Sequence, residues 1–194
     1  MNPEANVEHW AERHLRAIGD LLTDDLRRHV AALAGDNVDF YGYAILPEDY
    51  TTITDDDPPS ITVAFNCESD IAEANVGNVY YRFSPDEWKH YIHTGFDNTN
   101  AALRSLYVKF TGQFYNDPDD AQCQANRGLF FDCVHRTYLN SLSRTRADST
   151  FATHIFLVIW IPCSSYNIIG ESAKTLNPAE VYDVFVSEFA VDGG

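Results

Sequence analysis

Residues 80–88 read Tyr-Tyr-Arg-Phe-Ser-Pro-Asp-Glu-Trp, an aromatic run that meets the signals for the start of a helix. The aromatic residues favour a strand over Val79–Phe83. Ser84 can cap the first amides of a helix, Pro85 fits the first helical position, and Glu87 can complete a capping box. The stretch therefore predicts a strand followed by a helix that runs to about His93.

Before this corner the chain predicts one long helix and two strands. Apolar residues recur in steps of three and four over 7–34, the spacing of an amphipathic helix with one buried stripe. Asp39–Leu46 has apolar residues at both parities, as in a strand buried on both faces. Ser60–Asn66 alternates, and we expect it to lie beside the first strand because only the loop 47–59 separates them.

After the corner the periodicity predicts two helices, over about 96–110 and 121–143. Thr153–Pro162 is apolar at both parities, which favours the centre of the sheet, and Tyr166–Glu171 is a candidate for an adjacent strand. Asn177-Pro178-Ala179-Glu180 repeats the cap, proline and glutamate pattern and predicts a closing helix.

Strands and helices come in runs without strict alternation, which predicts an α+β fold. We expect one domain over residues 1–194, with an antiparallel or mixed central sheet and helices packed on it. The chain is 194 residues long and shows no linker, repeat or low-complexity segment.

The net charge is −16, and residues 36–120, with 16 acidic and 4 basic side chains, carry −12 of it. This sign disfavours nucleic-acid binding, because phosphates would be repelled. A basic protein partner would be attracted and steered by this field. Solubility alone is the alternative explanation of the charge.

Composition also bears on location and on the cysteines. No apolar run is long enough for a membrane span, and no basic region leads into an apolar one at the N-terminus, so we expect a cytoplasmic protein without membrane contact. The four cysteines are scattered without zinc-finger spacing, and we expect free thiols.

No motif fixes a reaction, a cofactor or a metal. The triplet Asp55–Asp57 invites a calcium interpretation, but two prolines follow where ligands or the turn should come, so we expect a solvated loop. Glu87, His90 and His93 lie three apart, and on a helix such side chains drift across a wide arc. A thiol or metal site that uses these three residues with His154 or Cys163 would need the fold to bring them together.

The carboxylates most suited to a basic partner lie in and after the acidic loop. They are Glu48, Asp49, Asp55, Asp56, Asp57, Glu68, Asp70 and Glu73.

Four segments together are similar to a bacterial family of domains of unknown function, number 4303. They are Phe40–Ala44, Tyr81–Trp88, Phe96–Asn100 and Leu176–Tyr182, and the resemblance spans most of the chain. The family's usual Trp before Ser-Pro is Phe83 here. The resemblance implies a shared fold and carries no catalytic residues.

We therefore expect a non-enzymatic, acidic, protein-binding domain, of the kind represented by immunity proteins that inhibit basic bacterial toxins; that analogy is one of general type. Two alternatives stay open. One is an enzyme of unknown class with a thiol or metal site, and the other is a scaffold domain without catalysis.

Overall fold

The computed structural model describes residues 3–47, 58–161 and 167–189. The elements in chain order are α1 (Pro3–Gly35), β1 (Phe40–Pro47), β2 (Ile61–Cys67), η2 (Glu68–Asp70), η3 (Glu73–Asn75), α2 (Val79–Phe83), η4 (Pro85–Glu87), β3 (His90–Ile92), α3 (Asp97–Phe114), α4 (Ala121–Ala147), β4 (Phe156–Ile159), α5 (Ile168–Leu176) and α6 (Ala179–Phe189).

The strands form one mixed sheet in the order β3-β2-β1-β4. β1 pairs antiparallel with β2 and parallel with β4, and β2 pairs antiparallel with β3. The expected α+β fold with a mixed sheet and packed helices is confirmed. β1 and β2, the two strands expected to lie side by side, are neighbours.

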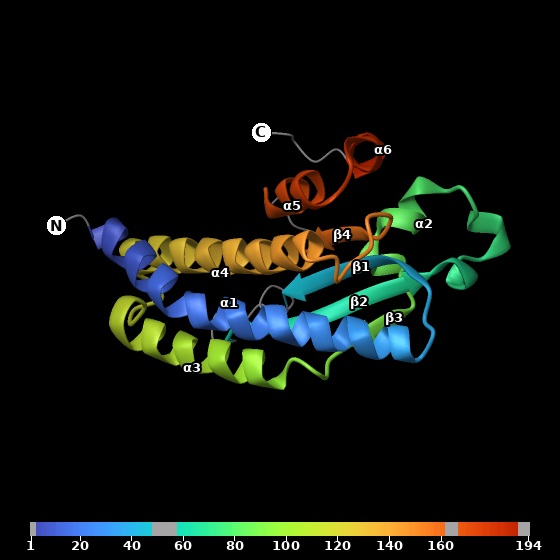
Figure 1. Cartoon of the computed structure of the whole chain (residues 1–194). Coiled ribbons are helices and arrows are strands. Elements are labelled where there is room, and N and C mark those ends of the chain that lie inside the picture. Colours follow the sequence, from blue (N-terminus) through green and yellow to red (C-terminus); the bar gives the residue numbers. More distant parts are fainter. Residues whose placement is uncertain (1–2, 48–57, 162–166, 190–194) are drawn as a thin grey trace.

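Helices cover both faces of this sheet. In Figure 1, α1, α3 and α4 form a group of long helices, and α5 and α6 lie beyond β4. On one face, His29 of α1 bonds to the Tyr43 hydroxyl at 2.7 Å. On the other face, the Phe156 ring meets Phe83 of α2 and Phe185 of α6, at 4.8 and 5.5 Å between centroids. β1 and β2 are consequently buried on both faces, where alternation was expected for β2.

The opening stretch folds differently from its prediction. Val79–Phe83 is a helix rather than a strand, because the Asn78 side chain caps it at Tyr80 N and its aromatic rings pack on α6. Of the helix predicted to run from Ser84 to about His93, only η4 (Pro85–Glu87) is helical.

The predicted helix to His93 is wrong because Trp88 turns the chain out of helical geometry. Trp88 has extended backbone angles, and its ring fills the space beside Gly42. The next residues, His90–Ile92, then pair with β2. The capping box is absent too: Ser84 Oγ is buried and has no hydrogen-bond partner in the described part of the chain.

The second corrected region is the edge beside β4. Within the described residues β4 lies at the end of the sheet rather than at its centre. Residues 168–171, part of the segment considered for an adjacent strand, belong to helix α5, and Asn167 is its N-cap. On this side of β4, side chains make hydrogen bonds to the backbone that a neighbouring strand would otherwise make. Asn177 Oδ1 accepts from Leu157 N at 2.8 Å, Asn177 Nδ2 donates to Leu157 O at 2.7 Å, and Ser172 Oγ accepts from Ile159 N at 3.0 Å. The closing helix is confirmed as α6, but the Asn177 side chain, predicted to cap it, bonds to the backbone of β4 instead.

Candidate functional site

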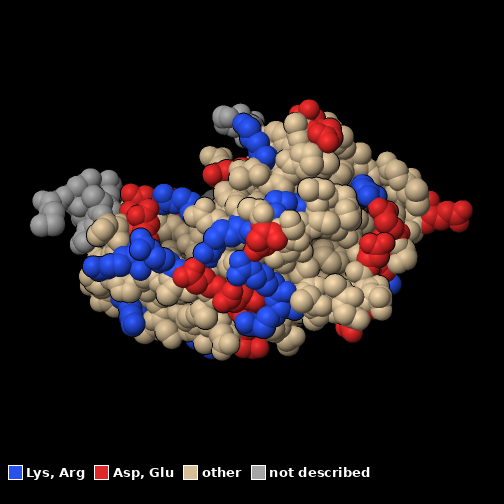
Figure 2. Space-filling model, in the orientation of Figure 1, with Lys and Arg blue, Asp and Glu red and all other residues tan. Residues whose placement is uncertain are grey.

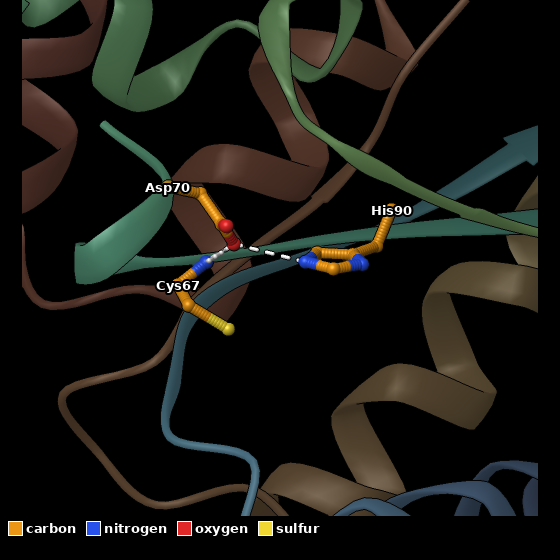
Figure 3. A group of neighbouring side chains, drawn as sticks. All are labelled: Cys67, Asp70 and His90. Carbon is orange, nitrogen blue, oxygen red and sulfur yellow. Dashed lines mark hydrogen bonds and ion pairs between the residues drawn. The ribbon is translucent and has the colours of Figure 1, made fainter. Parts of the chain in front are cut away.

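The pairing of β2 with β3 gathers three side chains of different chemistry at one end of the sheet. Cys67 ends β2, Asp70 ends the turn of η2 that follows, and His90 begins β3, where it pairs with Phe65. Their donor atoms, a sulfur, an oxygen and a nitrogen, all lie within 4.8 Å of one another. Figure 3 shows Asp70 between the other two, pointing at the His90 ring.

Asp70 is the centre of this cluster. Its Oδ1 accepts from Lys89 Nζ at 2.8 Å, and its Oδ2 accepts from His90 Nε2 at 2.9 Å and from the Cys67 amide at 3.2 Å. Its side chain is only 7% exposed. Burial raises the pKa of Asp70, but the hydrogen bonds from Lys89, His90 and Cys67 outweigh it and hold the pKa at about 2. The carboxylate is therefore charged throughout the neutral range.

The pKa of the Cys67 thiol is shifted in the opposite direction to that of Asp70. Burial and the neighbouring Asp70 charge raise its pKa above the ordinary value. Since the thiolate is the nucleophilic form, this environment disfavours thiol catalysis at neutral pH.

The His90 ring is fixed by stacking. It lies on the Phe65 ring with 4.5 Å between centroids and 5° between the planes, and its side chain is 35% exposed. One ring edge thus faces Asp70 while the site remains open to solvent.

A second set of polar groups supports the cluster from behind. Asn66 accepts from the Lys89 amide at 3.1 Å and donates to the Tyr41 hydroxyl at 3.0 Å. The Arg82 guanidinium lies 4.4 Å above the Tyr41 ring and bonds to both carboxylate oxygens of Glu68, at 2.5 and 3.1 Å. These contacts connect β1, β2, η2, α2 and the start of β3.

The structure separates the predicted partner-binding carboxylates into three groups. Glu48, Asp49, Asp55, Asp56 and Asp57 lie outside the described residues. Glu68 and Asp70 each form an ion pair, with Arg82 and Lys89 respectively. Glu73 is exposed in η3.

The residues considered for a thiol or metal site do not meet as a group in the part that is described. His93 bonds to the Thr62 hydroxyl at 2.9 Å, His154 is exposed in the loop before β4, and Glu87 is exposed in η4. Cys163 lies outside the described residues. Cys67, Cys123 and Cys133 are free thiols, as expected.

Sequence reasoning missed the association of Cys67 and Asp70 with His90. Cys67 and Asp70 are close in sequence, but His90 reaches them only through a β3 strand that the sequence predicted as helix. The one available signal was Cys67-Glu68-Ser69-Asp70 directly after a strand.

A groove of about 550 Å³ between α1 and α4 offers a different environment, with Arg136 and Arg144 in its lining. Both cations already have carboxylate partners, Arg136 with Glu8 at 3.2 Å and Arg144 with Asp20 at 2.7 Å. Two cations of the groove are thus already paired with carboxylates, whereas the Cys67 cluster presents ligand atoms.

No helix among the described residues is long and apolar enough to cross a bilayer. Comparison with curated proteins and with solved structures finds no match. The model of one family, "Domain of unknown function (DUF4303)", matches residues 22–178, a range that contains Cys67, Asp70 and His90. The chain therefore belongs to the DUF4303 family of domains of unknown function.

Proposed function

We propose that this chain is a non-enzymatic cytoplasmic protein that binds a basic protein partner, acting as an immunity-type inhibitor of a basic bacterial toxin domain. The charge carries the proposal: −16 for the chain, with −12 in residues 36–120. Such a field attracts and orients a cationic protein and repels nucleic acid, so it suits an inhibitor of a toxin that itself binds nucleic acid.

The described surface offers carboxylates at one end of the molecule. Glu73 in η3, and Asp86 and Glu87 in η4, are exposed. Figure 2 shows acidic side chains at the end where Figure 1 places α2 and its short flanking helices. Along the long helices the two signs are interleaved, as in the Arg144–Asp20 pair. The helix surface is thus closer to neutral than the η3–η4 end.

The ion pair between Glu68 and Arg82 is suited to exchange. Their side chains are 60% and 40% exposed. Exposed pairs contribute little to stability, on the order of 0–1 kcal/mol, so an arginine of a partner can replace Arg82 at small cost. Asp70 is too buried for direct contact and contributes only its charge.

The two alternatives differ from this proposal in chemistry. A thiol enzyme needs an accessible thiolate, and the raised pKa of Cys67 works against it. A scaffold whose charge serves solubility would bind its partners with little dependence on salt.

Co-expression with the product of the adjacent gene tests the proposal. We expect a basic, growth-inhibiting protein whose toxicity is relieved by this chain and which co-purifies with it at low ionic strength. A neighbouring product that is not basic, or toxicity that this chain does not relieve, would contradict the assignment.

A further inference from the structure

The cluster of Cys67, Asp70 and His90 has a feature that partner binding does not require. It places a thiol sulfur, a carboxylate oxygen and an imidazole nitrogen within 4.8 Å of one another, and it is the one group of at least three such ligand atoms found in the described residues. We propose that these three side chains bind a single Zn²⁺ ion. The proposal replaces the sequence-based expectation of no metal and is independent of the proposed function.

The separation between Asp70 and His90 fits tetrahedral zinc after a small adjustment, and the Cys67 sulfur lies within 4.8 Å of both other ligand atoms. Bonds of about 2.0–2.3 Å to O, N and S place neighbouring ligands about 3.3–3.6 Å apart. Asp70 Oδ2 and His90 Nε2 are 2.9 Å apart as a hydrogen-bonded pair. An ion that replaces the shared proton would therefore push these two atoms apart by about half an ångström.

The cluster is held in place before any ion arrives. Lys89 Nζ bonds to Asp70 Oδ1 at 2.8 Å and leaves Oδ2 as the ligand oxygen. The Cys67 amide orients the same carboxylate, and Phe65 fixes the His90 ring by stacking. Such outer contacts are typical of metal sites, where they orient the ligands.

The donor set selects the class of ion. Calcium and magnesium take oxygen ligands, whereas thiolate with imidazole favours borderline-soft ions such as Zn²⁺. Three protein ligands also leave a fourth position, which water or a partner's side chain can fill. The 35% exposure of His90 provides the access.

Binding must release protons. The Cys67 thiol has to lose its proton, and His90 has to present Nε2 as a lone pair while Nδ1 keeps its hydrogen. Burial and Asp70 raise the pKa of Cys67 in the metal-free protein, so protons compete strongly for the sulfur. We therefore expect zinc affinity to rise with pH across the neutral range.

Titration of the metal-free full chain with Zn²⁺, and with Co²⁺ as a spectroscopic probe, tests the proposal. We expect one equivalent to bind and the Co²⁺ form to show a thiolate-to-cobalt charge-transfer band. Cys67→Ser should abolish that band. Cys67→Ser and His90→Gln should each weaken Zn²⁺ binding by about 100-fold or more, because loss of a direct ligand costs at least as much as loss of a residue that only orients a ligand, which costs up to about 100-fold.

Matched controls separate this site from other thiols and imidazoles. Cys123→Ser and His154→Gln change the same residue types away from the cluster, and both should bind Zn²⁺ as the unaltered chain does. Circular dichroism and thermal melting establish that each variant folds. The proposal is overturned if folded wild-type protein binds no equivalent of Zn²⁺, or if binding persists unchanged in both Cys67→Ser and His90→Gln.

Discussion

Asp70 Oδ2 and His90 Nε2 lie 2.9 Å apart and connect the turn after β2 to the first residue of β3. Lys89 bonds to the other oxygen of Asp70, and the Cys67 amide bonds to Oδ2. This one carboxylate therefore connects the end of β2 to the start of β3. The described part of the acidic region is thus partly structural: the buried Asp70 carboxylate stabilises the fold, while exposed carboxylates such as Glu73 remain available to a partner.

Replacing the Asp70 carboxylate tests that structural role. Asp70→Asn keeps the shape but removes the charge, and we expect the free energy of unfolding at pH 7 to fall by about 1–2 kcal/mol, limited by the exposure of Lys89. The folded-state pKa is depressed to about 2 from an ordinary 3.8, so this stability is present above pH 4 and is lost as the pH falls from about 4 to about 2. Urea unfolding at several pH values measures both effects. Glu73→Gln on the same loop is the control, and equal stability of the two variants would refute the role.

The contact between Gly42 and Trp88 makes a second prediction. A Cβ at position 42 would stand 2.7 Å from the Trp88 ring, so Gly42→Ala should displace the indole and cost about 1–3 kcal/mol. Gly112→Ala, in α3 with open space around it, should instead stabilise by about 0.5–1 kcal/mol through helix propensity. Thermal melting compares them. Gly42→Ala as stable as Gly112→Ala would show that the Trp88 ring does not pack against position 42.

The side-chain edge of β4 makes a third prediction. Asn177→Ala removes both bonds to the Leu157 backbone and should cost about 2–3 kcal/mol, because a buried amide and carbonyl lose their partners. Native-state hydrogen exchange should show loss of protection at the Leu157 amide in particular. Asn140→Ala, at an exposed site in α4, should leave that amide unchanged. Full protection of Leu157 in Asn177→Ala would mean that another group covers the strand edge.

A buried histidine predicts the response to mild acid. Burial lowers the pKa of His135 to about 4, so the imidazole is neutral in the folded state but protonates near pH 6.5 when unfolded. Its contribution is present above pH 6.5 and is lost as the pH falls toward 4, by up to about 3 kcal/mol. In His135→Gln this part of the pH dependence should vanish, whereas His154→Gln should keep it. Chemical unfolding between pH 7 and pH 4 measures the slopes, and parallel curves for wild type and His135→Gln would contradict the assignment.

Some elements of the fold could be predicted from the sequence and others could not. The helix over 7–34 and the buried strand at 39–46 were predictable, because the spacing of apolar residues reflects the side of each element that meets the core. The end of the sheet was not, since β3 has only three residues and its extended form comes from Trp88 against Gly42 and from pairing with β2. Helix α5 was missed because Ile168 and Ile169 favour a strand by composition.

The candidate site was predictable only in part. Composition identified the acidic region, and His90 was considered as a ligand, but with Glu87 and His93 on a helix that does not form. The partners that the fold gives to His90, Cys67 and Asp70, depend on strand register, which depends on tertiary contacts and not on local pattern.

The central claim is that exposed carboxylates near η3 and η4 attract a basic partner, and charge reversal measures it most directly. With the partner obtained by co-expression, its affinity should fall steeply as salt rises from low to physiological levels. The double variant Glu73→Lys/Glu87→Lys should bind at least about tenfold more weakly, chiefly through a slower association rate, with a shallower salt dependence. Asp119→Lys, in the loop before α4, should bind nearly as the unaltered chain does. Affinity that is insensitive to salt, or an equal loss in Asp119→Lys and in the double variant, would contradict the account.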